Sequence, residues 1–120
     1  MHELSLCGAI ADIATRHARD RQVDVVHVRI GELRQVVPDT LIFCWSMVTS
    51  GTGLAGCELD VERVRAVLCC RACDAEHPMG EYLALACRSC GALDVDVVSG
   101  EEFLVTALDL AAVDSRDVAR

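Results

Sequence analysis

The chain has 120 residues, the length of one domain or of one small domain with an appended module. Hydrophobic residues make up 52% and charged residues 25%, which excludes a disordered chain, and the net charge of −8 argues against nucleic acid or an anionic membrane as the partner. Eight cysteines without an N-terminal signal segment predict a cytoplasmic, reducing setting, where close pairs more often bind metal than form disulfides.

The first two predicted elements are a helix over residues 4–19 and a strand over residues 23–30. In the strand, Val26, Val28 and Ile30 alternate with polar residues, which is the pattern of a half-buried strand. In the helix, apolar residues recur at spacings of three and four, which predicts one buried face: Leu4, Cys7, Ile10, Ala11, Ala14 and Ala18.

A second helix is predicted from Pro38 to about Gly51, because proline suits the first helical turn and glycine a helix end. Its buried face would hold Leu41, Cys44, Trp45 and Val48. Strict alternation over residues 57–62 predicts a second strand with an acidic, solvated face, and strand patterning returns at Val95 and Val97 and then over residues 104–110. This order predicts an α+β fold: a small three-stranded sheet with two helices, and a zinc-ribbon-like lobe inserted before the last strand.

Two C-x-x-C pairs, thirteen residues apart, carry the clearest chemistry in the sequence: Cys70, Cys73, Cys87 and Cys90. Two residues between thiolates let one tight turn present both sulfurs to a single ion, and two such turns complete a tetrahedral shell suited to Zn²⁺. Disulfides and a thiol redox pair are the competing interpretations. Such a small lobe needs its metal to fold, so the zinc would be structural.

Other cysteines and one histidine leave the zinc ligands open to alternatives. Cys69 adjoins Cys70, but only Cys70 has the two-residue spacing to Cys73. His77 lies four residues past Cys73 and could replace a thiolate, or it is an exposed loop histidine. The remaining three cysteines fall on apolar faces and are expected to be small buried hydrophobic residues: Cys7, Cys44 and Cys57.

The first three residues, Met1, His2 and Glu3, form a second candidate metal site. A free α-amine, the following backbone amide nitrogens and an imidazole can converge on one metal in a plane. Such a square-planar nitrogen site favours Ni²⁺ or Cu²⁺ over Zn²⁺. Taken alone the tripeptide is a weak signal, because any protein can carry histidine at position two.

Several motifs in a fixed order resemble the HypA/HybF family of nickel metallochaperones for NiFe-hydrogenase maturation, and the resemblance covers roughly residues 1–110. They are Met1 to Leu6, Arg29 to Leu33, Val37 to Asp39, Leu41, Phe43, Gly51 to Thr52, the strand from Leu59 to Val64, both cysteine pairs, and Ser99 to Phe103. Two features depart from the family pattern: the extra Cys69, and Asp74 in place of the glycine usual after the first pair.

The resemblance implies a nickel-binding α/β domain over residues 1–68, completed by residues 96–113, and a zinc-binding domain over residues 69–95. It implies that the His2 side chain, the Met1 α-amine and the backbone nitrogens of His2 and Glu3 bind nickel as cargo. It also implies that the four paired cysteines hold structural zinc. The implied partners are a HypB-type GTPase and the hydrogenase large-subunit precursor, and some family members also serve urease.

Two other classes of protein remain as alternatives. A zinc-ribbon protein–protein adaptor would hold zinc but no transferable metal. An enzyme is disfavoured, because four thiolates close the zinc shell and leave no position for a catalytic water. A nucleic-acid-binding ribbon would need basic residues with interleaved aromatics, whereas acidic residues outnumber arginines in this lobe and its single aromatic is Tyr82.

Overall fold

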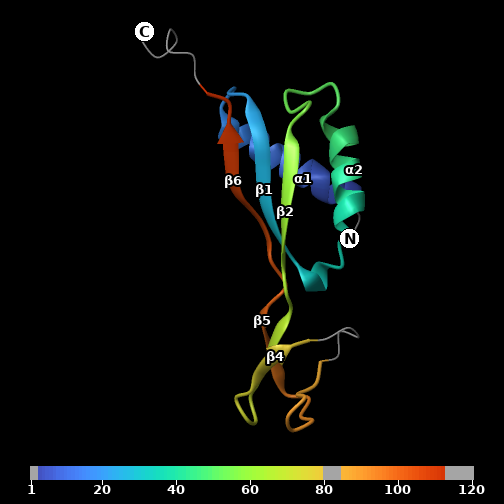
Figure 1. Cartoon of the computed structure of the whole chain (residues 1–120), viewed down its shortest axis with the longest axis vertical. Coiled ribbons are helices and arrows are strands. Elements are labelled where there is room, and N and C mark those ends of the chain that lie inside the picture. Colours follow the sequence, from blue (N-terminus) through green and yellow to red (C-terminus); the bar gives the residue numbers. More distant parts are fainter. Residues whose placement is uncertain (1–2, 80–84, 113–120) are drawn as a thin grey trace.

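Two three-stranded sheets lie end to end along an elongated molecule of 64 × 30 × 17 Å (Figure 1). The structure is a computed structural model, and it describes residues 3–79 and 85–112. In chain order the elements are α1 (Glu3–Ala18), β1 (Val23–Gly31), the 3₁₀ turn η1 (Glu32–Arg34), α2 (Pro38–Thr49), β2 (Glu58–Val64), β3 (Val67–Cys70), β4 (Glu76–Pro78), β5 (Val95–Ser99) and β6 (Phe103–Leu110). The predicted α+β fold, with two helices and a small sheet, is confirmed.

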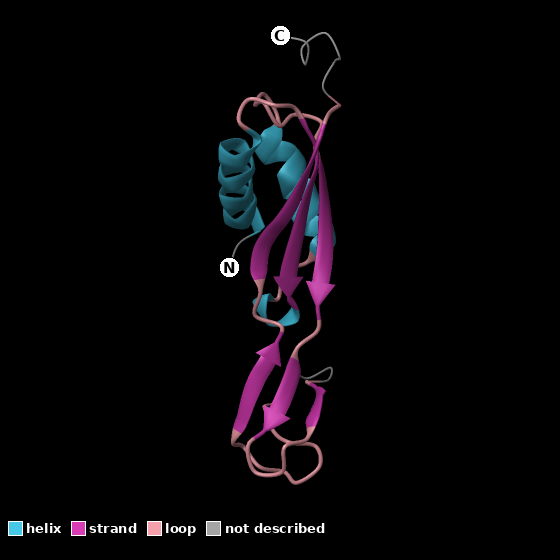
Figure 2. Cartoon of the chain, turned by 90° about the vertical axis from the view of Figure 1, so that its left-hand side faces the viewer, coloured by secondary structure: helices cyan, strands magenta, loops and turns pink. Residues whose placement is uncertain are grey.

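The first sheet has the order β2-β1-β6, with β1 parallel to β2 and antiparallel to β6. A parallel pair needs a crossover between its strands, and η1 followed by α2 supplies it. Both helices cover one face of this sheet and leave the other face open (Figure 2). We call this part, residues 3–64 and 103–112, the helical unit.

The core of the helical unit lies between the helices and β1, whose Val26, Val28 and Ile30 are buried as the alternation predicts. The prediction that the three unpaired cysteines are buried is also confirmed, and burial raises the pKa of the Cys7 thiol to about 11. Leu4, in contrast, is exposed, so its predicted place on the buried face is wrong. Leu6 is buried instead, because the face of α1 that meets the sheet runs through Leu6, Cys7, Ile10 and Ala14.

The second sheet has the order β4-β3-β5, and both of its pairings are antiparallel. We call this part, residues 67–79 and 85–99, the cysteine unit. The sequence patterning did not reveal the short strands β3 and β4, because three or four residues with cysteines among them show no clear alternation. Among the described residues, no helix is both long and apolar enough to cross a bilayer.

A narrow junction joins the two units where three chain segments cross. A Cβ atom added to Gly31 would lie 1.9 Å from the carbonyl oxygen of Gly100, so the backbones meet more closely than any side chain allows. Gly100 also has φ +110°, a conformation that favours glycine. The Glu32 carboxylate accepts a hydrogen bond of 2.8 Å from the backbone N–H of Ala66. Leu33 packs against the small core of the cysteine unit.

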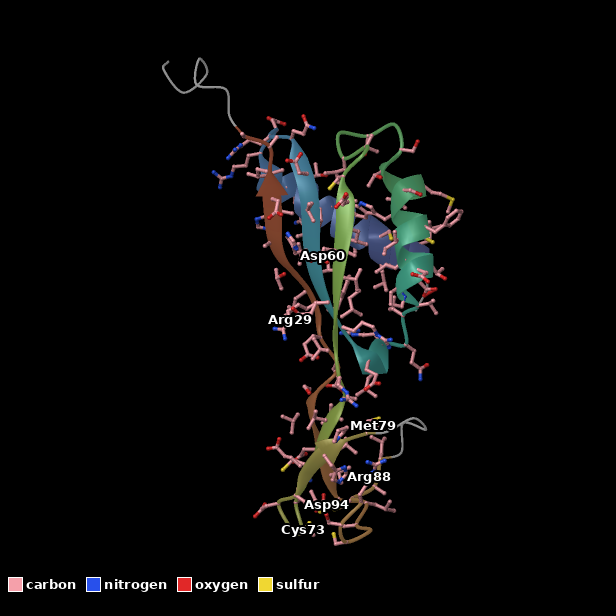
Figure 3. All side chains as sticks on the ribbon, in the orientation of Figure 1. Arg29, Asp60, Cys73, Met79, Arg88 and Asp94 are labelled. Atoms are coloured by element: carbon pink, nitrogen blue, oxygen red, sulfur yellow. The ribbon has the colours of Figure 1, made fainter. Side chains whose placement is uncertain are left out.

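A histidine bridges all three strands on the open face of the first sheet. The His27 ring on β1 places Nδ1 2.8 Å from an Asp60 carboxylate oxygen on β2 and Nε2 2.9 Å from an Asp109 carboxylate oxygen on β6. Both ring nitrogens can donate together only when the ring is protonated. The hydrogen bond to Asp109, followed by the one to Asp60, raises the pKa of His27 above its ordinary value. Arg29 and Asp60 lie on this same open face in Figure 3.

We expect the His27 bridge to make stability depend on pH. Because the folded-state pKa of His27 is raised, its contribution is complete below the unfolded pKa of about 6.5 and disappears as the pH rises through the folded value. The melting temperature of the unchanged protein should exceed that of a His27→Gln variant at pH 6, and the difference should shrink by pH 8.5. Thermal unfolding of both proteins across this range measures it, and a difference that does not vary with pH would contradict the ionised bridge.

Candidate metal centre

The two C-x-x-C turns lie at the far end of the cysteine unit, where Cys73 and Asp94 are labelled in Figure 3. Cys70 is the last residue of β3, so the first turn follows directly from that strand. The second turn precedes β5, which pairs with β3 and returns the chain beside the first turn. The antiparallel β3–β5 pairing therefore brings together cysteines that lie up to twenty residues apart in the sequence.

The two turns share one backbone geometry. In the first, the N–H of Asp74 donates to the carbonyl of Cys70 at 2.8 Å; in the second, the N–H of Gly91 donates to the carbonyl of Cys87 at 2.8 Å. Both residues after the second cysteine are left-handed, with φ 60° at Asp74 and 75° at Gly91. Aspartate tolerates this conformation better than most residues, so the turn forms without the glycine.

The four paired cysteines direct their sulfurs at one point. The Sγ atoms of Cys70, Cys73, Cys87 and Cys90 all lie within 4.8 Å of one another. The Cys70–Cys90 and Cys73–Cys87 sulfur pairs are each 3.6 Å apart. A tetrahedron with metal–sulfur bonds of about 2.3 Å has edges of about 3.8 Å, so the spacing fits a zinc ion at the centre. All four cysteines are free of disulfides.

Neither alternative ligand joins this group of four sulfurs within the described residues. Side chains alternate along a strand, so Cys69 projects to the opposite face of β3 from Cys70, and Cys69 is half-exposed while Cys70 is fully buried. His77 uses its Nε2 to accept a hydrogen bond of 3.1 Å from the backbone N–H of Arg88. The geometry therefore favours the four cysteines with the repeated spacing.

Electrostatics already favour a thiolate at one of the four positions. The backbone N–H of Cys90 lowers the pKa of the Cys87 thiol to about 5. Thiolate is the form that binds metal.

Arg71, the first residue between Cys70 and Cys73, links the first C-x-x-C turn to β5 through hydrogen bonds. Its guanidinium Nε donates to an Asp96 carboxylate oxygen at 2.9 Å and Nη1 to an Asp94 oxygen at 3.0 Å, while its backbone N–H donates to the Asp94 carbonyl at 2.9 Å. The Arg71 guanidinium is therefore paired with two carboxylates of the same unit.

The other predicted site falls mostly outside the described residues. Met1 and His2 are not described by the structure, and Glu3 is the first residue of α1.

Comparison with known proteins identifies the family of the chain. Residues 1–110 match the family described as "Hydrogenase/urease nickel incorporation, metallochaperone, hypA". The hydrogenase maturation factor HypA of Geotalea uraniireducens is 42% identical over 110 residues, which cover 92% of this chain and 99% of that protein. The corresponding protein of a Roseiflexus strain is 35% identical, covering 91% of each chain.

Solved structures show the same fold. The solution structure of the nickel metallochaperone HypA from Helicobacter pylori superposes with a TM-score of 0.65 and 20% identity, covering 94% of this chain and all of that one. A mixed sheet under two helices, joined to a four-cysteine cluster, places the chain among small proteins with a candidate metal site. Its sequence match makes the assignment specific: the chain belongs to the HypA family of nickel metallochaperones, which act in hydrogenase maturation.

Proposed function

We propose that the chain carries Ni²⁺ at its N-terminus, on the α-amine of Met1, the imidazole of His2 and the backbone nitrogens of His2 and Glu3. Membership of a nickel-incorporation family is the observation that carries this proposal. A planar site at a chain end leaves axial positions open, where an acceptor can attack and take the nickel by stepwise ligand exchange.

The four paired cysteines are proposed to hold one resident Zn²⁺. Bound zinc would supply the cross-link that the cysteine unit needs, because the apolar cluster beside it is small: Leu68 and Met79 with Ala66 at the junction, and Val95 and Val97 only partly buried against them. The shell is complete with four thiolates, which supports a structural role and not a catalytic one. The chain thus divides into a nickel-binding helical unit and a zinc-binding cysteine unit.

The proposed recipient is the NiFe-hydrogenase large-subunit precursor, reached with a HypB-type GTPase; the family description also includes urease. The affinity order places copper above nickel, so the nickel site cannot ensure fidelity by itself. Metal availability and docking to the correct partner must supply the remaining selectivity. Eight free cysteines suit a reducing compartment, which supports a cytoplasmic location.

Nickel titration of three matched proteins tests the nickel site. His2→Ala, and separately a chain extended by four glycines before Met1, so that no free amine lies within chelating reach of His2, should each lose nickel binding. His17→Ala, which changes an exposed histidine on α1, should keep it. Binding should also weaken from pH 7.5 to about pH 6, because the nitrogen ligands must lose protons to bind metal. Isothermal calorimetry and the absorption of square-planar nickel report the result.

Two outcomes of that titration would contradict the proposal. Equal nickel binding by the extended chain would exclude the amine-and-amide site. A protein that contains zinc but binds no nickel, with no effect of His2→Ala, would favour the alternative of a zinc-ribbon protein–protein adaptor.

A further inference from the structure

A groove of about 530 Å³ separates α2 from the start of β2. Its walls are largely apolar: Ile42 and Trp45 project from α2, Ala55 and Cys57 come from the preceding turn, and Leu59 comes from β2. Ile42 is 46% exposed, although it is a large aliphatic side chain. The groove contains none of the proposed nickel or zinc ligands, so anything that binds there is separate from the proposed metal sites.

The strand beside this groove is an edge strand. β2 pairs with β1 on one side, and within the described residues no strand pairs with its other side. An unpaired edge presents backbone N–H and C=O groups to a further strand. Such a strand would lie along the groove, with alternate side chains directed under α2.

The side chains of β2 specify what an added strand should contain. Leu59 is buried toward the helices, whereas Asp60 and Glu62 are exposed on the open face. Glu58, at the start of the strand, is also exposed and borders the groove. Asp60 and Glu62 pair toward β1, with His27 and Arg29, and Glu58 makes no ion pair among the described residues. Residues that face each other on neighbouring strands project from the same face of the sheet. Basic side chains of an added strand would therefore lie beside the carboxylates of β2, and its apolar side chains would fill the groove.

We infer that the β2 edge and the α2–β2 groove bind an extended segment of a partner protein in which apolar and basic residues alternate. A second copy of this chain fits poorly, because pairing two β2 edges would set one carboxylate row against another. The groove and the row together select a strand with one apolar face and one basic face.

The test uses a seven-residue capped peptide that alternates valine with lysine, which matches the length of β2. Trp45 is the single tryptophan and lines the groove, so its fluorescence should change on titration. Amide resonances of residues 58–64 should shift in NMR spectra. Two control peptides should each bind at least about tenfold more weakly than the alternating valine–lysine peptide. The first has glutamate in place of every lysine, and the second has the same valines and lysines with the lysines grouped at one end.

Neighbouring residues provide matched controls on the protein. Ile42→Ser should weaken binding of the alternating peptide, and Phe43→Ser, which alters an exposed residue outside the groove lining, should not. Glu58→Lys should weaken binding about tenfold, and Asp12→Lys, the same charge change on the exposed side of α1, should leave it unchanged.

Three results would overturn the inference. The first is equal binding of the alternating and grouped peptides, and the second is amide shifts that fall outside β2. The third is a dimer of the unliganded chain, seen by sedimentation, that Ile42→Ser abolishes. Because nickel binding is measured separately, failure of this test leaves the proposed nickel site untouched.

Discussion

A Cys90→Ser variant is expected to lose its zinc and to unfold the cysteine unit while the helical unit stays folded. Cys90 is exposed, so a serine hydroxyl at this position carries little burial cost and the change isolates the loss of a ligand. Structural zinc sites contribute about 10–16 kcal/mol of apparent binding free energy, far more than the small core of this unit can replace. Metal analysis should find about one zinc per unchanged chain and much less in the variant.

The neighbouring cysteine supplies the control for this prediction. Cys69→Ser should retain its zinc, because Cys69 projects away from the four-sulfur group. NMR amide spectra should show resonances of residues 67–99 collapsing in Cys90→Ser, with those of β1 and β2 preserved. Loss of zinc in Cys69→Ser, or full retention in Cys90→Ser, would contradict the assigned ligand set.

Gly31→Ala is expected to destabilise the protein by about 3 kcal/mol or more, because no rotamer change can relieve contact between two backbones. The new methyl group would lie 1.9 Å from the Gly100 carbonyl oxygen. Moving the chain apart would break the hydrogen bonds from Gly31 N–H to Glu102 at 2.7 Å and from Leu33 N–H to Gly100 at 2.8 Å. Denaturant unfolding measures the change.

Gly8→Ala is the matched control for this second prediction. A Cβ atom at Gly8 meets nothing within 4 Å, and Gly8 lies inside α1. Alanine is favoured over glycine in a helix, so this variant should be more stable by about 0.5–1 kcal/mol. Equal stability of the two variants would show that the junction accommodates a side chain.

Local patterns in the sequence were sufficient for much of the fold and for the cysteine cluster. The spacing of two residues selected Cys70 over Cys69, and the structure brings Cys70 together with Cys73, Cys87 and Cys90. Alternation located β1, and proline and glycine bracketed α2. These features depend on periodicity or spacing along a single stretch of chain, which the sequence displays directly.

Features that depend on pairing between distant segments were not predictable in this way. The His27 bridge needs the registers His27–Asp60 and His27–Ala107, and a one-residue slip in either would move a carboxylate to the other face. The close approach of Gly31 and Gly100 likewise depends on how the two sheets join. Glycine at both positions was visible in the sequence, but nothing there indicated that the two residues meet.

The central place of β1 in its sheet sets an order of events during synthesis. β1 and β2 are complete by residue 64, but the other neighbour of β1 is β6, which begins only at residue 103. All four paired cysteines therefore leave the ribosome before the first sheet can close. The proposed zinc ligands are made while one edge of β1 is still unpaired. Zinc bound by the nascent chain would therefore precede completion of the helical unit.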